Sequence, residues 1–220
     1  MTGPDRRACV ILGAGGHARL VIDAIFAAGE FEIEAVIDRD AGLWGSEVLG
    51  VPVVGGDDQL DKFVDQGVES FALGVGSSGN TDLKRQVYVE ARERGLRPLK
   101  VRHPRAVCSS LATLGDGTQI MPNSVIGPGA VLGENVAVNA GAVVEHDCQL
   151  ADHVFVGTGA VLCGGVEVGE GAFIGAGATV RQMIKIGAET ILGAGAVAVF
   201  DVPSQVVSVG VPARVVREKK

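Results

Sequence analysis

Residues 120–150 read IMPNSVIGPGAVLGENVAVNAGAVVEHDCQL, and they decide the fold because a branched aliphatic residue recurs at every sixth position. The recurrence continues unbroken to Leu192, which makes thirteen consecutive positions with Ile, Val or Leu. A small or β-branched residue stands two places before most of them, and a glycine often follows directly after. A period of six fits neither an α-helix, with 3.6 residues per turn, nor a single strand, with a period of two.

A period of six is typical of the hexapeptide β-helix, in which each hexapeptide forms one side of a triangular coil. The aliphatic residue points inward, the small residue fits the narrow interior, and the following glycine is expected to tolerate the corner. Residues 18 apart should then stack about 4.8 Å apart, the spacing of paired strands. We therefore predict a left-handed parallel β-helix over residues 118–198, with an irregular start near Ala112 and Leu114. Such a solenoid offers little concave surface within one chain, which favours an oligomer with ligand sites between chains.

The first hundred residues follow a different pattern. Residues 7–12 form an apolar strand that ends at a glycine-rich loop, and apolar residues at helical spacing follow until Gly29. We predict further strands over residues 33–37 and 71–76 and a helix over 82–94 that ends at Gly95. Strands that alternate with helices predict a small Rossmann-like α/β domain with a parallel sheet. The boundary is placed near residues 102–104, so that a βαβ domain (1–103) precedes the solenoid and its C-terminal tail (104–220).

The loop Gly13-x-Gly15-x-x-Ala18 directly follows the first strand, which is the placement of a phosphate-binding turn. Asp38 ends the next strand and could contact a ribose or a base. A dinucleotide dehydrogenase would need a second mononucleotide half, for which about one hundred residues are too few. The alternative is that the glycines merely shape a tight turn.

Composition excludes several other classes of function. The net charge of −7 disfavours a nucleic-acid binder, and no run of 18 apolar residues suggests a membrane span. Residues 1–7 do not have the pattern of a signal peptide, so a cytoplasmic protein is expected. The four cysteines lack metal-site spacing and are expected to be reduced, and no metal is expected.

One histidine of the solenoid is a candidate general base. His146 comes two residues after the inward position of Val144, so it should point outward near a corner, between two carboxylates. Gly164 lies 18 residues later, one coil above, where a bare backbone N–H could hold a thioester carbonyl. Asp147 can orient His146 only if the corner bends the chain there. An ordinary solvated histidine is an equally good interpretation of the local pattern.

The glycine loop Gly-x-Gly-Gly-His on a small βαβ domain, the hexapeptide solenoid, the Asn-x₆-His-Asp motif and a terminal Gly-Val-Pro-Ala together resemble the bacterial sugar O/N-acyltransferases. The chain is most similar to the sialic-acid O-acetyltransferase-like group and to the N-acetyltransferases of bacillosamine and perosamine pathways. The resemblance covers nearly the whole chain. It implies a homotrimer that transfers an acetyl group directly from acetyl-CoA to the amino group of a UDP- or GDP-linked 4-amino-4,6-dideoxyhexose.

The resemblance also implies roles for individual residues. His146 would be the base, Asp147 its orienting partner, and Asn139 a polar residue near the reacting groups. Acetyl-CoA would contact Gly164, Phe155, Ala176 and Ala194, and the nucleotide sugar would contact Gly15, Gly16, His17, Asp38, Arg39 and Gly76. Phe155 is a departure, because the family often has a second histidine there that contacts the acetyl donor.

Three alternatives stay open from the sequence. A sugar O-acetyltransferase, or an enzyme that acts on a small amine, would have the same fold. A zinc lyase like the γ-type carbonic anhydrases would need three histidine ligands, and the solenoid has two histidines. A non-catalytic assembly subunit would keep the solenoid for oligomerisation alone.

Overall fold

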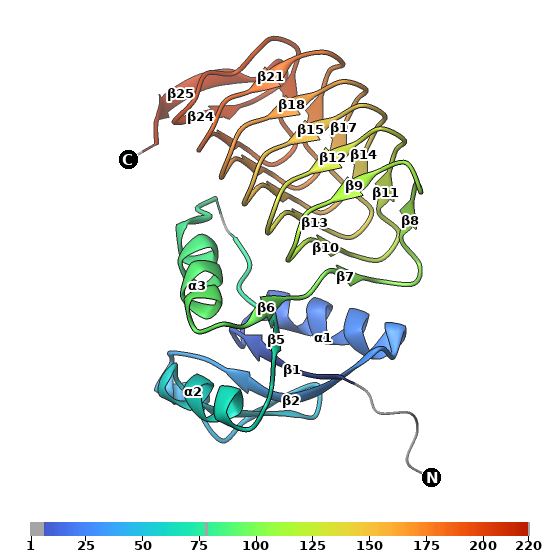
Figure 1. The fold of residues 1–220 in the computed structure, drawn as a ribbon. Coiled ribbons are helices and arrows are strands. Elements are labelled where there is room, and N and C mark those ends of the chain that lie inside the picture. Colours follow the sequence, from blue (N-terminus) through green and yellow to red (C-terminus); the bar gives the residue numbers. More distant parts are fainter. Residues whose placement is uncertain (1–6, 78, 220) are drawn as a thin grey trace.

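The computed structural model describes residues 7–77 and 79–219, which form an N-terminal α/β domain and a triangular solenoid (Figure 1). Residues 1–6, Ser78 and Lys220 lie outside the described residues. The expectation that the chain has no signal peptide rests mostly on residues 1–6. Among the helices of the described part, none is long and apolar enough to span a membrane.

The N-terminal domain is built on a sheet in the order β3-β4-β2-β1-β5-β6, in which β3 and β4 are antiparallel and the other pairs are parallel. Its strands are β1 (Arg7–Leu12), β2 (Phe31–Ile37), β3 (Glu47–Val48), β4 (Val51–Gly55), β5 (Ser70–Leu73) and β6 (Arg97–Pro98). The helices are α1 (Gly16–Ala28), α2 (Asp58–Asp65), α3 (Asp82–Glu93) and the short 3₁₀ turn η1 (Ala41–Leu43).

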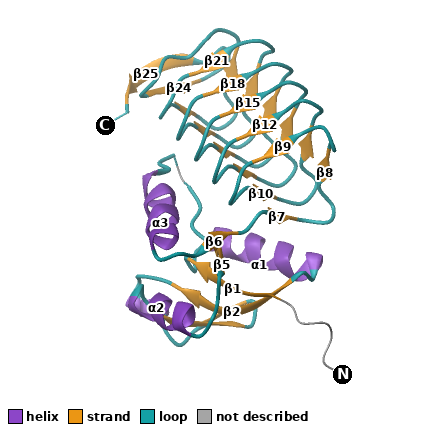
Figure 2. Ribbon diagram, viewed as in Figure 1, coloured by secondary structure: helices purple, strands orange, loops and turns teal. Residues whose placement is uncertain are grey.

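Helices cover both faces of this sheet (Figure 2). Cys9 and Ile11 of β1 pack with α1, whereas Val10 and Leu12 pack in the cluster that holds Leu60 of α2 and Tyr88 of α3. Side chains of a strand point alternately to the two faces, so a sheet that is buried on both sides needs the unbroken apolar run that β1 has. The predicted parallel sheet is therefore present.

The solenoid has three faces of parallel strands spaced 18 residues apart, except at the C-terminal end of the first face, where Ile191 pairs with Val207. The first face contains β7 (Val101–Arg102), β10 (Gln119–Ile120), β13 (Ala137–Val138), β16 (Phe155–Val156), β19 (Phe173–Ile174), β22 (Ile191–Leu192), β24 (Val206–Val209) and the antiparallel β25 (Arg214–Glu218). The second face contains β8 (Val107–Cys108), β11 (Val125–Ile126), β14 (Val143–Val144), β17 (Val161–Leu162), β20 (Thr179–Val180) and β23 (Val197–Ala198). The third contains β9 (Thr113–Leu114), β12 (Val131–Leu132), β15 (Gln149–Leu150), β18 (Glu167–Val168) and β21 (Lys185–Ile186).

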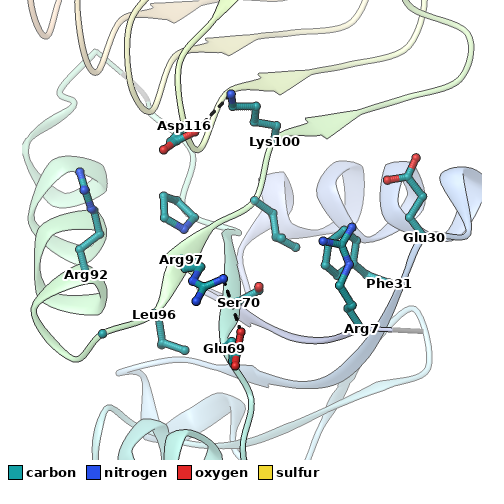
Figure 3. Close-up of a pocket in the computed structure, with 13 residues that line it drawn as sticks. Arg7, Glu30, Phe31, Glu69, Ser70, Arg92, Leu96, Arg97, Lys100 and Asp116 are labelled. Carbon is teal, nitrogen blue, oxygen red and sulfur yellow. Dashed lines mark ion pairs between the residues drawn. The ribbon is translucent and has the colours of Figure 1, made fainter. Parts of the chain in front are cut away.

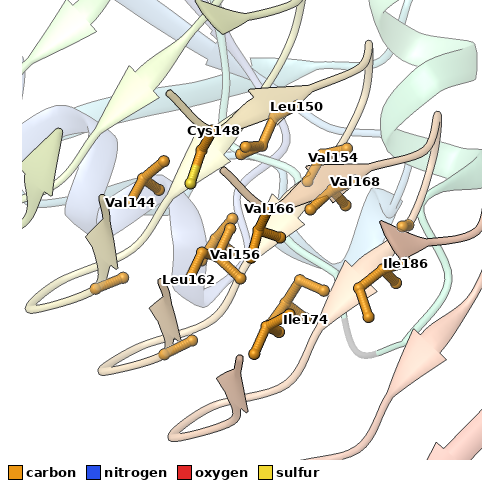
Figure 4. Packing of buried hydrophobic residues seen from close by; sticks show 14 of the residues in the cluster. Val144, Cys148, Leu150, Val154, Val156, Leu162, Val166, Val168, Ile174 and Ile186 are labelled. Carbon is orange, nitrogen blue, oxygen red and sulfur yellow. The ribbon is translucent and has the colours of Figure 1, made fainter. Parts of the chain in front are cut away.

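The periodic aliphatic residues fill the interior of the solenoid (Figure 4). Val144, Leu162 and Ile174 are fully buried, and the small residues two places before the periodic positions, such as Ala160 and Ala178, are buried with them. The predicted hexapeptide β-helix is therefore present. It begins earlier than expected, because β7 already pairs with β10 as the first strand of its face.

The glycines that follow the aliphatic positions have a different role from the one predicted. The left-handed corner residues come two places later, as at Gly159 (φ 67°) and Asp147 (φ 60°). Gly157 is needed because a methyl group there would lie 2.7 Å from the backbone nitrogen of Ala176 in the next coil. Close approach between coils, and not corner conformation, therefore selects glycine directly after the aliphatic residue.

A polar seam joins α3 to the corner of the solenoid between its third and first faces. Lys84 is fully buried there and donates to the backbone and side-chain oxygens of Asn135, and burial lowers the pKa of Lys84 to about 7. The Thr81 hydroxyl donates to the Gly171 carbonyl at 2.9 Å. Tyr88 contacts the ring of His153 edge-on at 5.7 Å. This seam holds the N-terminal domain against the first face of the solenoid.

The predicted elements of the N-terminal domain differ from the structure in extent. The strand predicted over residues 71–76 ends at Leu73, because Gly74 and Gly76 already belong to a loop packed against Gly13 and His17. The β3–β4 hairpin and α2 were not predicted, since their apolar runs are short and lie among acidic residues.

We predict that Ile174→Ala lowers the free energy of unfolding by about 2–5 kcal/mol, because it leaves a cavity in a rigid, fully buried interior. Urea unfolding followed by circular dichroism measures this loss. Val131→Ala, on the half-exposed outer side of the third face, is the matched control and should change stability by less than about 1 kcal/mol. Equal losses in the two variants would contradict the packing assigned to the interior.

Candidate active site

The glycine loop lies at the carboxyl end of β1, where ligands bind in parallel α/β sheets. Gly15 precedes the first residue of α1, and no side chain caps this end of the helix. A methyl group added to Gly15 or Gly16 would meet no atom of residues 7–77 and 79–219 within 4 Å, so these residues leave the space over the loop open. Free backbone N–H groups at a helix start attract an anion, and this loop can therefore hold a phosphate.

Asp38 and Arg39 follow β2 beside this loop. The Asp38 carboxylate accepts from the backbone N–H of Ala14 at 2.6 Å and from that of Asp40 at 2.8 Å, so it fixes the shape of the loop. Arg39 pairs with Asp57 at 2.7 Å and also with Glu90 of α3. A small cavity between these residues and α3 is also lined by Leu83 and Val87, which gives it one charged and one apolar wall.

His146 and Asp147 form a hydrogen-bonded pair at the corner between the second and third faces. The left-handed conformation of Asp147 bends the chain, and its carboxylate reaches Nδ1 of His146 at 2.8 Å. Both side chains are more than half exposed. The hydrogen bond with Asp147, and then the charges of Asp147 and Glu145, raise the pKa of His146. The arrangement leaves Nε2 of the imidazole to take up a proton.

Gly164 lies directly beside the imidazole in the next coil. A side chain there would overlap Nε2 and Cε1 of His146, so only glycine allows the ring to rest against this backbone. The Gly164 carbonyl accepts from Met183, whereas the Gly164 N–H makes no hydrogen bond within residues 7–77 and 79–219. A free donor beside a candidate base can stabilise a developing oxyanion.

The other predicted residues lie elsewhere in the chain. Asn139, Ala176 and Ala194 follow strands of the first face, and they lie at the corner between the first and second faces. The second face therefore separates them from His146. Phe155 lies on the first face, 93% buried, with its ring stacked 5.3 Å from Phe173 and 6.0 Å from the ring of His17. One chain thus holds two groups of candidate residues on two different corners.

The second face between these corners is apolar and uncovered. Its outward positions form a ladder in which Val107 is 63% exposed and Val125 36% exposed, and the higher members are half-buried: Val143, Val161, Thr179 and Val197. The third face presents Gln149, Glu167 and Lys185 instead, the last two as an ion pair at 2.7 Å.

A cavity of about 670 Å³ lies far from both groups, at the amino ends of β1, β5 and β6 (Figure 3). Three of its four cations are already paired: Arg97 with Glu69 at 3.6 Å, Lys100 with Asp116 at 3.2 Å, and Arg92 with Glu134 at 2.6 Å. The fourth, Arg7, stacks on the ring of Phe31. Parallel sheets bind ligands at the opposite, carboxyl end of their strands, so we do not place the functional site here.

Two buried residues near the glycine loop were missed by the sequence analysis. Gln119 bridges His17 and Leu73, and Lys84 lies in the seam described above. The sequence pattern predicts that both are exposed, because Gln119 is at an outward position of a solenoid strand and Lys84 is on a helix rich in charged residues. Within the described part of the chain, no three His, Cys, Asp or Glu side chains lie together as a metal site would need.

Family comparisons agree with this division of the chain. The PglD N-terminal domain family matches residues 9–90, and the bacterial transferase hexapeptide family (six repeats) matches residues 112–146 and 147–182. No curated protein matches the chain.

Solved structures resemble the whole chain. A histidine variant of perosamine N-acetyltransferase from Caulobacter crescentus, in complex with CoA and GDP-perosamine, is 39% identical, with 94% of this chain and 96% of that chain covered and a TM-score of 0.89. The acetyltransferase domain of PglB from Neisseria gonorrhoeae, in complex with acetyl coenzyme A, is 33% identical, with 96% and 100% covered and a TM-score of 0.87. WeeI from Acinetobacter baumannii is 23% identical, with a TM-score of 0.80, which shows a shared fold.

We predict that Asp147→Asn lowers the pKa of His146, because the carboxylate that stabilises the imidazolium is lost. His146 then gives up its proton at lower pH than in the parent protein. A pH titration of the imidazole signals by NMR measures this. Glu167→Gln, an exposed carboxylate on the third face, is the control and should leave the His146 titration in place. A titration unchanged in Asp147→Asn would contradict the pairing.

Proposed function

This chain belongs to the bacterial acetyltransferases that join a PglD N-terminal domain to hexapeptide repeats, and we propose that it acetylates a nucleotide-linked 4-amino-4,6-dideoxyhexose with His146 as general base. The family resemblance indicated by the sequence is confirmed, and the chain is an acyltransferase. Its reaction is the acetyl-CoA-dependent N-acetylation of an amino sugar.

One observation carries the proposed mechanism: the His146 imidazole rests on the bare backbone of Gly164, and its far nitrogen is held by Asp147. In the direct transfer, the amino nitrogen of the sugar attacks the thioester carbonyl of acetyl-CoA, and Nε2 of His146 takes the amine proton. The Gly164 N–H donates to the oxyanion while it exists. Collapse of this intermediate releases the CoA thiolate, which takes up a proton, and no acyl-enzyme forms.

GDP-perosamine supplies the model for the acceptor, because the relative that binds it is 39% identical over nearly the whole chain. We propose that the diphosphate of such a nucleotide sugar lies over Gly15 and Gly16, with the base near Asp38 and Arg39. Gly76 would then line the path of the sugar beside His17. Phe155, for which the resemblance implies contact with acetyl-CoA, flanks His17 from the first face.

The two corners of the chain support a homotrimer as the active form. The N-terminal domain lies against the first face, whereas His146 lies at the far edge of the second. Packing the apolar second faces around a three-fold axis would bury their valine ladder. It would also set His146, Asp147 and Gly164 of one chain opposite Asn139, Ala176 and Ala194 of its neighbour. Acetyl-CoA would then bind between the chains.

We predict that the protein releases thiol from acetyl-CoA in the presence of a GDP- or UDP-linked 4-amino-4,6-dideoxyhexose, with a product heavier by one acetyl group in mass spectra. His146→Ala should lower kcat by about 10²- to 10⁴-fold, the contribution of a general base, with little change in affinity for the nucleotide sugar. Glu167→Gln, an exposed carboxylate on the third face, is the control and should keep the parent kcat. Turnover at the parent rate in His146→Ala would defeat the base assignment, and turnover only with hydroxyl acceptors would make the enzyme an O-acetyltransferase.

Subunit mixing tests whether one site uses two chains. Gly15→Asp keeps a good helix N-cap but places a carboxylate where the diphosphate would lie, so it should be folded and inactive. After unfolding and refolding together, inactive Gly15→Asp and inactive His146→Ala chains should regain activity, because about a quarter of random interfaces pair an intact loop with an intact base. Light scattering measures the oligomer. No activity in mixed oligomers would mean that each site lies within one chain.

A further inference from the structure

The imidazole of His17 is held by the solenoid as well as by its own domain. His17 lies in the first turn of α1, beside the open glycine loop. Its Nε2 lies 2.8 Å from Oε1 of Gln119, which is on β10 of the solenoid and only 1% exposed. The ring of Phe155 flanks the imidazole at 6.0 Å. A candidate ligand residue of one domain therefore has its orientation set by the other.

The direction of the Gln119 side-chain amide is fixed by its second partner. Nε2 of Gln119 donates to the carbonyl of Leu73, the last residue of β5, at 2.7 Å. A backbone carbonyl only accepts, so a reversed amide would set two acceptor oxygens against each other in a buried place. The amide oxygen therefore faces His17, and the hydrogen bond between them requires a proton on Nε2 of His17.

The second ring nitrogen of His17 is consequently an acceptor. Burial and the nearby Lys84 lower the pKa of His17, against the opposing effect of the Gln119 hydrogen bond, so the neutral ring is favoured. With the proton on Nε2, Nδ1 carries a lone pair. Nδ1 has no hydrogen-bond partner in residues 7–77 and 79–219. In that part, Nε of Arg85 is the one side-chain nitrogen that is both fully buried and without a partner. Among these residues, Nδ1 of His17 is therefore unpaired and not completely buried.

We propose that Gln119 is a positioning residue that fixes His17 as the Nε2–H tautomer, so that Nδ1 accepts a hydrogen bond from a hydroxyl of the nucleotide sugar. This rests on the proposed binding of a nucleotide sugar at the glycine loop. Phosphate oxygens offer only lone pairs and would be repelled by Nδ1, and the backbone N–H groups at the start of α1 serve them. His17 thus distinguishes a hydroxylated ligand and does not act as a phosphate-binding cation.

The tautomer is measurable without turnover. Long-range ¹H–¹⁵N spectra of the ¹⁵N-labelled protein, with the His17 signals identified by their loss in His17→Ala, distinguish the two neutral tautomers and the imidazolium. The expected result at neutral pH is the Nε2–H form in the parent protein and a mixture of both neutral forms in Gln119→Leu. An imidazolium or an Nδ1–H tautomer in the parent protein would overturn the proposal.

Steady-state kinetics test the consequence for the ligand. In Gln119→Leu the imidazole loses the acceptor that holds its Nε2 proton, so neither its tautomer nor its orientation is fixed. Nδ1 is then no longer held as an acceptor toward the ligand, and KM for the nucleotide sugar should rise about 3- to 10-fold with kcat nearly unchanged, the loss of one hydrogen bond. Gln149→Leu, the same change on the exposed third face, is the matched control, and thermal unfolding checks that both variants fold.

The outcomes separate this inference from the proposed function. A lower KM in Gln119→Leu would mean that the fixed tautomer opposes ligand binding, and an unchanged KM that the tautomer of His17 has no part in binding. Either result overturns the inference while turnover by the parent protein stands. If the Gln119 variant binds the free nucleoside diphosphate and the nucleotide sugar equally more weakly than the parent protein does, the hydroxyl that His17 contacts belongs to the ribose. If only the nucleotide sugar is affected, it belongs to the hexose. Absence of nucleotide-sugar binding in the parent protein would remove the proposed function, and the tautomer result would still hold.

Discussion

Closure of each solenoid coil in 18 residues is the constraint on which the rest of the structure depends. Because strands on one face pair at this interval, any residue lies directly against the residue 18 places away. His146 and Gly164 are such a pair, and the imidazole can rest on the next coil only because that coil has no side chain there. A single inserted residue between them would break the contact, so the repeat that fills the core also builds the candidate site.

The polar seam along α3 determines which solenoid face remains free. Buried hydrogen bonds from Thr81 and Lys84 to the backbone oxygens of Gly171 and Asn135, which lie two coils apart, fix the N-terminal domain at one corner. The domain thereby covers the aromatic first face. Directional bonds of this kind specify an orientation that apolar contact alone leaves loose. The apolar second face is left uncovered as a result, between the corner of Asn139 and the corner of His146. The orientation of the N-terminal domain and the proposed trimer contact are in this way linked by one interface.

Much of this could be predicted from the sequence, and the parts that could not share a physical cause. The solenoid was predictable because one residue class recurs at one period, and the His146–Asp147 pair because the period places His146 at a corner. The roles of Lys84 and Gln119 were not, because both are polar residues whose burial is created by the other domain. The glycines directly after the aliphatic positions were predicted to form the corners, but they are required by close contact with the backbone of the next coil. Such a contact between coils leaves no local signal in the sequence.

Lys84 connects the seam to the glycine loop electrostatically. Within residues 7–77 and 79–219 its ammonium has only the neutral oxygens of Asn135 as partners, so burial lowers its pKa without an opposing carboxylate. Its charge also lowers the pKa of both His17 and His153. A carboxylate in the place of Asn135 would neutralise the Lys84 ammonium, and His17 would then be easier to protonate. Burial is the main cause of the lowered pKa of His17, and the same buried cation that fixes the domain adds to it. The acceptor character proposed for His17 therefore depends on contacts with both the solenoid and α3.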